Sequence, residues 1–169
     1  LQFNNITHLD LAIDTSTNFS KALVKMIRNK DYYPIINGTK ITDRKKLIED
    51  ILYIGIGNLE RIKEYSILIQ QKKNDLSINA YNKKREIENK SHKEYIMESY
   101  ENPNQLHRLE VRINSDAMKD FFTREHLEYN PAMFITDDWL WLFYLTFLNR
   151  VIRFQTVKGR KVYGVMDLI

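Results

Sequence analysis

Three short segments with strictly alternating apolar and polar residues constrain the fold of this chain most strongly. They cover residues 7–14, 76–81 and 106–114. This period of two is typical of a strand that buries one face, because successive side chains point to opposite sides of a sheet. We therefore expect three strands with one aliphatic and one polar face each. The aliphatic faces consist of Leu9, Leu11, Ile13, Leu76, Ile78, Ala80, Leu109, Val111 and Ile113.

The segments between these strands predict helices and further strands. Apolar residues at helical spacing predict a helix over residues 19–29, with a cap in residues 15–18, and two more over 115–127 and 138–150. Ser115 and Asp137 are the expected caps of the last two. Residues 32–42 predict a strand pair around an Asn37-Gly38 turn, and residues 51–56 a further strand. We expect a turn or short helix over 43–50, a loop over 70–75, and a loop followed by a helix over 86–100.

This order of elements predicts one α+β domain, in which helices flank an antiparallel sheet. The length of 169 residues and a hydrophobic fraction of 43% suit a single domain covering residues 1–169. The chain does not begin with Met, which suggests either a domain excised from a longer protein or a disordered start.

Composition excludes some functional classes and leaves others open. The chain has no Cys, which excludes disulfide scaffolds, thiolate metal sites and Cys nucleophiles. The net charge of +4 permits nucleic-acid binding without requiring it. No apolar run approaches the roughly 20 residues of a membrane span, and no leader pattern opens the chain. We therefore expect a cytoplasmic protein without a membrane partner.

The polar faces of the three strands carry chemically capable groups. Asp10 and Asp14 share one face, about 13 Å apart along the strand. Tyr81 ends the second segment, and Glu110 lies between Arg108 and Arg112 in the third. Carboxylate oxygens bind hard divalent ions such as Mg²⁺ or Mn²⁺, whereas Arg and Lys bind phosphate. A tyrosine beside a metal-bound phosphate can attack phosphorus.

A simpler interpretation stays open beside this one. Alternating polar residues on a strand are most often a solvated sheet face. Glu110 between two arginines is also explained by a ladder of ion pairs across strands. Tyr81 can be a surface aromatic or a platform on which a base stacks. The residues alone therefore predict a candidate metal–phosphate site, with the solvated face as the alternative.

Four motifs, in their order along the chain, bear on this choice. They are His8-Leu9-Asp10-Leu11-Ala12-Ile13-Asp14, the aliphatic Leu52-Tyr53-Ile54-Gly55, Tyr81-Asn82-Lys83-Lys84-Arg85-Glu86, and Arg108-Leu109-Glu110-Val111-Arg112. Together they resemble the rolling-circle replication initiator (Rep) proteins of plasmids and phages, especially the trans-acting Rep type. The resemblance covers about residues 6–114 and implies a Rep/relaxase-like nuclease fold.

The resemblance implies an enzyme that nicks one strand of origin DNA through a 5′-phosphotyrosine intermediate. It implies Asp10, Asp14 and Glu110 as ligands of Mg²⁺ or Mn²⁺, Tyr81 as the nucleophile, and Lys83 as a catalytic cation that neutralises phosphate. Its implied partners are the replication origin, as a single strand or hairpin, and a host helicase.

The sequence departs from the wider nicking-enzyme pattern in two ways. It lacks a His–hydrophobic–His triplet, so coordination is led by carboxylates, or His8 or His107 joins them. Residues 59–75 form a long gap before the tyrosine strand. If this gap displaces Tyr81, the substitutes are Tyr65, Tyr95 and Tyr100.

Basic stretches mark the expected DNA contacts. Residues 150–161 hold five Lys or Arg and no acid, with Gly159 at the expected tip of a hairpin. Such a hairpin can follow DNA phosphates, or it can be a solvated turn. The predicted nucleic-acid contacts are Lys83, Lys84, Arg85, Arg108, Arg112, Arg153, Lys158, Arg160 and Lys161.

Two further questions stay open at this point. The helix over 138–150 is apolar nearly all round, which favours a core position and leaves a homodimer interface as the alternative. The alternatives to a nicking enzyme are a non-catalytic DNA-binding module and a mobilisation relaxase.

Overall fold

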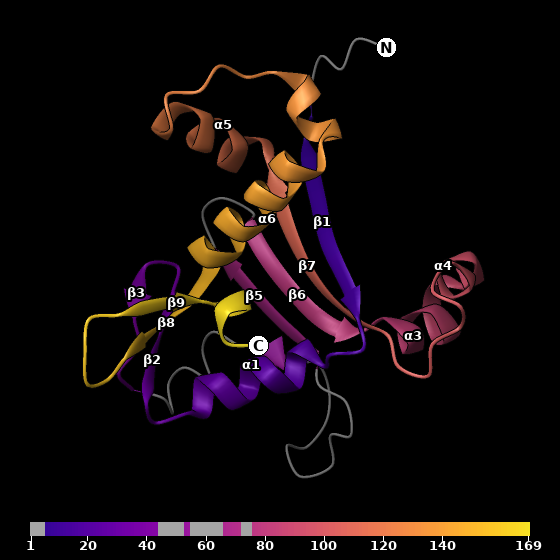
Figure 1. The fold of residues 1–169 in the computed structure, drawn as a ribbon, viewed down its shortest axis with the longest axis horizontal. Coiled ribbons are helices and arrows are strands. Elements are labelled where there is room, and N and C mark those ends of the chain that lie inside the picture. The colour runs from indigo at the N-terminus through magenta and orange to yellow at the C-terminus, as the bar shows by residue number, and fades with distance from the viewer. Residues whose placement is uncertain (1–5, 44–52, 55–65, 72–75) are drawn as a thin grey trace.

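The computed structural model describes residues 6–43, 53–54, 66–71 and 76–169. The three alternating segments form neighbouring antiparallel strands of one five-stranded sheet, in the order β1-β7-β6-β5-β4 (Figure 1). The sheet contains β1 (His8–Thr15), β7 (His107–Asn114), β6 (Leu76–Asn82), β5 (Ile67–Gln71) and β4 (Tyr53–Ile54). The predicted α+β class, with antiparallel strands and flanking helices, is therefore confirmed.

A second antiparallel sheet of four strands has the order β3-β2-β8-β9. Asn37 and Gly38 join its first two strands with φ angles of 50° and 80°, as a tight hairpin turn requires. The predicted strand pair over 32–42 and the predicted basic hairpin after residue 150 are both present. The strands are β2 (Tyr32–Ile36), β3 (Thr39–Lys40), β8 (Ile152–Thr156) and β9 (Val162–Gly164).

Helices pack on the aliphatic face of the five-stranded sheet. They are α1 (Phe19–Arg28), α5 (Ser115–Arg124) and α6 (Asp137–Val151). The Ser20 hydroxyl of α1 donates to the Ala80 carbonyl at 2.7 Å, and the Tyr144 hydroxyl of α6 donates to the Leu109 carbonyl at 3.2 Å. Helix α6 runs across the sheet and continues directly into β8, so it joins the two sheets (Figure 1).

Short helical turns complete the chain. Helix α3 (Lys83–Glu86), a π-helical turn (Ile87–Ser91) and α4 (Glu94–Ser99) follow β6 at one end of the sheet. The 3₁₀ turns Pro131–Ile135 and Val165–Asp167 precede α6 and follow β9. Among the described residues, no helix combines the length and the apolar character needed to cross a membrane.

Several predicted boundaries are wrong. Gln70 and Gln71 belong to β5 and pair with Ser77 and Leu76, so the predicted loop over 70–75 begins too early. Polar residues can continue a strand when its backbone hydrogen bonds are satisfied by a neighbour. The helix expected within 86–100 is present as α4, whereas the loop expected before it is largely the π-helical turn Ile87–Ser91.

Helix caps also differ from the prediction by one residue. Asn114, not Ser115, caps α5, because its side chain accepts from the Ala117 amide. Thr136, not Asp137, occupies the cap position of α6. The turn or short helix predicted over 43–50 lies almost entirely outside the described residues. Of the strand predicted over 51–56, only β4 lies within them.

Helix α6 is not buried on every side. Phe143, Phe147 and Leu148 are buried in the core, whereas Trp141 and Leu142 are 47% and 45% exposed. The core position predicted for this helix therefore holds for one side of it. A homodimer stays a prediction.

Candidate functional site

The polar faces of β1, β7 and β6 form three rows that cross the strands. The backbone register places one residue from each strand in every row. The sequence predicted that these side chains share a face, and the structure brings them together. The rows are Asp14–Arg108–Tyr81, Ala12–Glu110–Asn79 and Asp10–Arg112–Ser77.

Each aspartate of β1 is held by an arginine of β7. Arg108 donates from Nε to Asp14 Oδ1 at 2.7 Å and from Nη2 to Oδ2 at 2.6 Å. Arg112 donates in the same way to both oxygens of Asp10, at 3.0 and 3.1 Å. The hydrogen bonds and charge of these carboxylates raise the pKa of both arginines, so both stay charged.

Glu110 and Tyr81 meet between these two pairs. The Tyr81 hydroxyl lies 3.4 Å from Glu110 Oε2 and donates to it. Burial, and then the charge of Glu110, raise the pKa of Tyr81 to about 12, while the charge of Arg108 acts in the opposite direction. At neutral pH the phenol is therefore protonated, and its proton is directed at a carboxylate.

Lys83 lies against the ring face of the same tyrosine. Its Nζ forms an ion pair of 2.6 Å with Glu86 and lies 5.9 Å from the centre of the Tyr81 ring. Only 4% of Lys83 is exposed. Burial alone would raise the pKa of Glu86, but the hydrogen bond and charge of Lys83 outweigh it and lower that pKa. Asn82 positions this turn, because its side chain accepts from the Arg85 amide at 2.8 Å.

The predicted metal ligands fit a divalent ion in chemistry and only partly in arrangement. Carboxylate oxygens suit Mg²⁺ or Mn²⁺. In the described part of the chain, however, no three acidic or histidine side chains converge as a ligand group. Asp10 and Asp14 are engaged by arginines, whereas Glu110 has Tyr81 and, at 3.7 Å, Arg112 as neighbours. Metal binding by these residues stays a prediction.

The substitute tyrosines and the histidines lie in different places. The Tyr100 hydroxyl approaches Asp14 Oδ2 at 3.5 Å, whereas Tyr95 is 64% exposed. Tyr65 lies outside the described residues. His8 is exposed at the start of β1, and His107 is buried on the face opposite Arg108.

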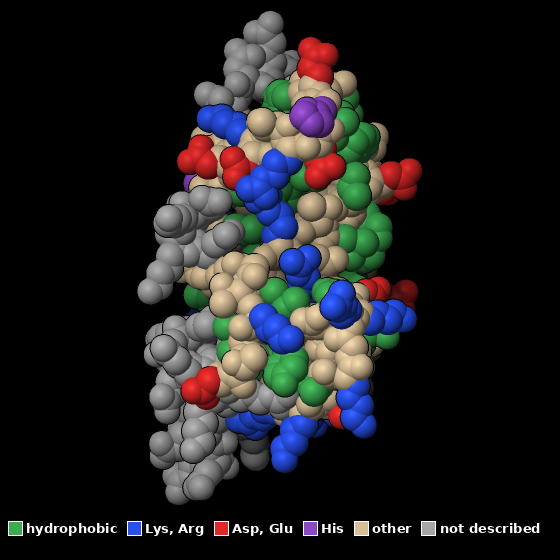
Figure 2. Space-filling view, turned by 90° about the vertical axis from the view of Figure 1, so that its left-hand side faces the viewer, with side chains coloured by type: hydrophobic (Ala, Val, Ile, Leu, Met, Phe, Trp, Pro, Cys, Tyr) green, Lys and Arg blue, Asp and Glu red, His purple; other side chains and the backbone are tan. Residues whose placement is uncertain are grey.

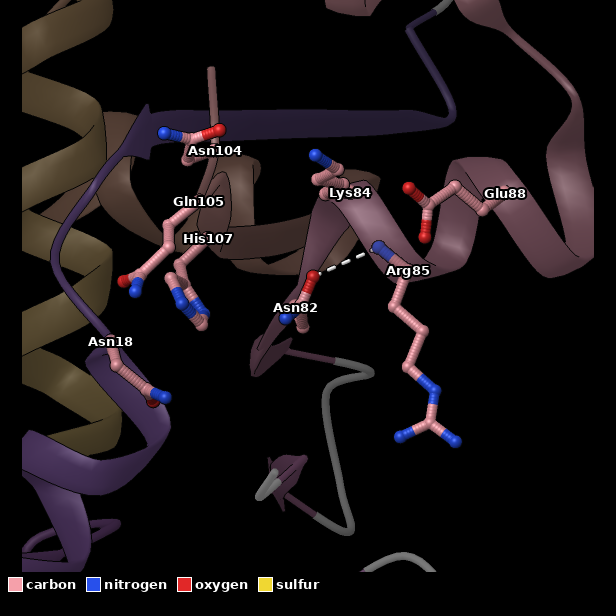
Figure 3. A pocket seen from close by; sticks show the side chains of 8 residues that line it. All are labelled: Asn18, Asn82, Lys84, Arg85, Glu88, Asn104, Gln105 and His107. Atoms are coloured by element: carbon pink, nitrogen blue, oxygen red, sulfur yellow. Dashed lines mark hydrogen bonds between the residues drawn. The ribbon is translucent and has the colours of Figure 1, made fainter. Parts of the chain in front are cut away.

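A polar cavity of about 350 Å³ opens where β6 ends and β7 begins (Figure 3). In Figure 3, Lys84 and Arg85 come from α3, while Asn104, Gln105 and His107 approach from the opposite side. Most of these residues were not predicted from the sequence, because single amide side chains form no recognisable pattern. The lining consists of Asn18, Asn82, Lys84, Arg85, Glu88, Asn104, Gln105 and His107.

The remaining predicted DNA contacts lie on the second sheet. Arg153 is an exposed residue of β8, and the exposed Lys158, Arg160 and Lys161 lie between β8 and β9. Figure 1 shows this hairpin on the opposite side of the molecule from α3 and α4. The predicted contacts therefore form two groups, one beside Tyr81 and one on the second sheet.

No protein-family model, curated protein or solved structure matches the chain.

Proposed function

We propose that this chain is a replication initiator that nicks and rejoins one strand of origin DNA, with Tyr81 as the nucleophile. The observation that carries the proposal is the hydrogen bond from the Tyr81 hydroxyl to Glu110 Oε2. It pairs a nucleophile with a proton acceptor on a sheet face where two arginines, hydrogen-bonded to Asp14 and Asp10, add positive charge. That the substrate is DNA is inferred from the resemblance of the motif order to Rep proteins.

The nicking step is a transesterification at one phosphodiester. Tyr81 Oη attacks phosphorus and transfers its proton to Glu110 Oε2. The bond from phosphorus to the 3′-oxygen breaks, and that oxygen takes a proton from water. The products are a 5′-phosphotyrosine and a free 3′-hydroxyl. Because the pKa of Tyr81 is raised to about 12, the phenolate is scarce at neutral pH and the carboxylate acceptor matters.

The neighbouring cations have separate roles in this scheme. The charge of Arg108 opposes the rise in the pKa of Tyr81, so Arg108 favours the negative charge that develops on the phenol oxygen. Lys83 places its ammonium group over the face of the Tyr81 ring and forms an ion pair with Glu86. Lys84 and Arg85 line the cavity at the same strand end and would bind the DNA backbone beside the scissile phosphate.

The metal ion implied by the resemblance would be Mg²⁺ or Mn²⁺, and it would polarise the scissile phosphate. Glu110 is the predicted ligand nearest to Tyr81, and Asp14 would have to give up hydrogen bonds from Arg108 to join it. The rejoining step reverses the first: a 3′-hydroxyl attacks the phosphotyrosine and releases Tyr81. A host helicase and a cytoplasmic location belong to the same proposal.

The test uses a supercoiled plasmid that carries the native locus of the chain, with Mn²⁺ or with EDTA. We expect open circles that retain protein after SDS treatment, in the Mn²⁺ sample alone. Tyr81→Phe should abolish the covalent link and spare DNA binding, while the matched Tyr100→Phe should keep both. A link that persists in Tyr81→Phe would show that another residue is the nucleophile.

A second candidate function is a non-catalytic DNA-binding module. The two Asp–Arg pairs favour it, because they occupy both predicted aspartate ligands. Retarded but intact plasmid in both samples would support this module and reject the enzyme. A mobilisation relaxase would also link covalently to DNA, but it would act on a transfer origin in place of a replication origin.

A further inference from the structure

Three arginines from separate elements line one cavity of about 550 Å³, which is formed by α5, α6 and the second sheet. Arg124 ends α5, Arg150 lies in the last turn of α6, and Arg153 belongs to β8. The rest of the lining is polar or small and includes no aromatic residue: Asn37, Gly38, Thr146 and Asn149. The cavity is distinct from the Tyr81 site and shares no residue with it.

The charge of this cavity is poorly balanced within the described residues. Asp120 is the acid that contacts the arginines, 3.6 Å from Arg124 Nη2 and 3.9 Å from Arg150 Nη2. No ion pair to Arg153 is found in the described part of the chain. Burial, and then the charge of Arg124, lower the pKa of Arg150. An anion in the cavity would relieve this repulsion between like charges.

Two side-chain amides of the lining have an oxygen without a hydrogen-bond partner. The side-chain oxygens Oδ1 of Asn37 and Asn149 are buried and have no hydrogen-bond partner within the described residues. Buried polar atoms without partners are uncommon and often mark a binding site. A backbone phosphate has no hydrogen to donate to these oxygens, so its hydrogen bonds in this cavity would come from the guanidinium groups.

The surface around the cavity is basic as well. Figure 2 shows Lys and Arg side chains over the middle and lower part of this face, whereas acidic side chains lie mainly in its upper part and at its rim. The second sheet contributes four exposed cations in addition to Arg153: Lys40, Lys158, Arg160 and Lys161. A phosphate in the cavity would therefore belong to a chain of phosphates that continues along the hairpin.

We propose that this cavity binds a backbone phosphate of duplex DNA, and that the second sheet is a duplex-binding surface separate from Tyr81. Spaced cations suit the regular phosphates of a duplex. Surfaces for single strands rely instead on aromatic side chains that stack with bases, and this cavity has none. The duplex site rests on the proposed function, because its ligand is the origin DNA, and it would contact that DNA outside the nicked strand.

The experiment measures the binding of a fluorescent duplex oligonucleotide of arbitrary sequence by anisotropy over a series of salt concentrations. Arg153→Gln should weaken binding about tenfold, and should reduce the slope of log K against log salt by about 0.9, the value for one lost phosphate contact. Arg153→Lys keeps the charge and should keep the slope. Lys90→Gln, an exposed charge beside α3, is the control for a general loss of charge.

Each outcome separates the two proposals. An unchanged slope in Arg153→Gln and Arg150→Gln would overturn the duplex site even if Tyr81 links to DNA. A reduced slope without any covalent link would keep the duplex site and reject the nicking function. Tighter binding of single-stranded DNA or RNA that depends on the same arginines would also overturn the proposal. Circular dichroism of each variant confirms that it is folded.

Discussion

Arg108 of β7 donates to both carboxylate oxygens of Asp14 on β1, through two hydrogen bonds of 2.7 and 2.6 Å. Arg112, four residues further along the same strand, donates to both carboxylate oxygens of Asp10 in the same way. The two pairs differ in burial. The Asp14 and Arg108 side chains are 5% and 19% exposed, whereas those of Asp10 and Arg112 are 46% and 53% exposed. The chain thus contains a matched buried and exposed copy of one interaction.

Asp14→Asn should lower the free energy of unfolding by about 3 kcal/mol, because it leaves the guanidinium of Arg108 buried without its partner charge. Asp10→Asn should cost less than about 1 kcal/mol, since water already screens that pair. Urea denaturation followed by circular dichroism measures both. Equal losses for the two variants would mean that burial does not set the strength of these pairs.

The ionisation of Tyr81 should make stability depend on pH in the alkaline range. Its pKa is 10.0 in the unfolded chain and about 12 in the folded one, so the folded state binds more protons between these values. Its contribution is complete below pH 10 and is lost as the pH rises through 12. Tyr81→Phe should therefore flatten the fall in the free energy of unfolding over this range.

The matched Glu110→Gln variant tests the cause of that shift. The charge of Glu110 raises the pKa of Tyr81, so its removal should bring that pKa closer to 10. The measurement is a ¹³C NMR titration of labelled tyrosine, with the Tyr81 signal identified by its loss in Tyr81→Phe. A pKa of Tyr81 that does not move would show that Glu110 does not face the hydroxyl in solution.

The sequence predicted the central strands well, because alternation with a period of two depends only on which side of the sheet each residue faces. That these strands lie side by side was a supposition of the candidate site, and the register confirms it. The second sheet was not predicted, since β2 and β8 pair across more than a hundred residues of chain. Periodicity identifies a strand but carries no information about its partner.

The candidate site was predicted in composition and not in pairing. The sequence indicated a face with Asp14, Arg108, Glu110 and Tyr81, and register brings them together. The sequence did not show with which acidic side chain each arginine would form its hydrogen bonds. The ladder of ion pairs was expected around Glu110, whereas the arginines bind the aspartates of β1 in both main pairs. The cavity of Arg124, Arg150 and Arg153 was invisible as a cluster, because two helix ends and a strand assemble it.

Asn82→Ala should remove the cap of α3 and cost about 1 kcal/mol of stability. Asn82→Asp keeps an acceptor oxygen and should restore most of that loss. Because α3 carries Lys83 under the Tyr81 ring, the Ala variant should also weaken covalent DNA linkage more than the Asp variant does. Thermal unfolding and the linkage assay, run on the same preparations, check the two effects. Equal covalent linkage in both variants would show that the Asn82 cap does not determine the position of Lys83.

Gly164→Ala should destabilise the protein through one contact. A Cβ at this position would lie 2.5 Å from Oδ1 of Asn149, a distance that requires the Asn149 side chain to move. Overpacking of this kind costs about 1–3 kcal/mol. Since φ of Gly164 is −72°, the backbone itself accepts an alanine, and the whole loss should come from the clash.

The double variant Gly164→Ala with Asn149→Ala therefore isolates the cause. It should recover much of the stability lost by Gly164→Ala alone, because the shorter side chain clears space for the new methyl group. Urea denaturation of the wild type, both single variants and the double variant completes the cycle. Additive losses would show that the two residues do not touch. Recovery would place the Asn149 amide firmly between β9 and the arginine-lined cavity, where its position affects the proposed phosphate site.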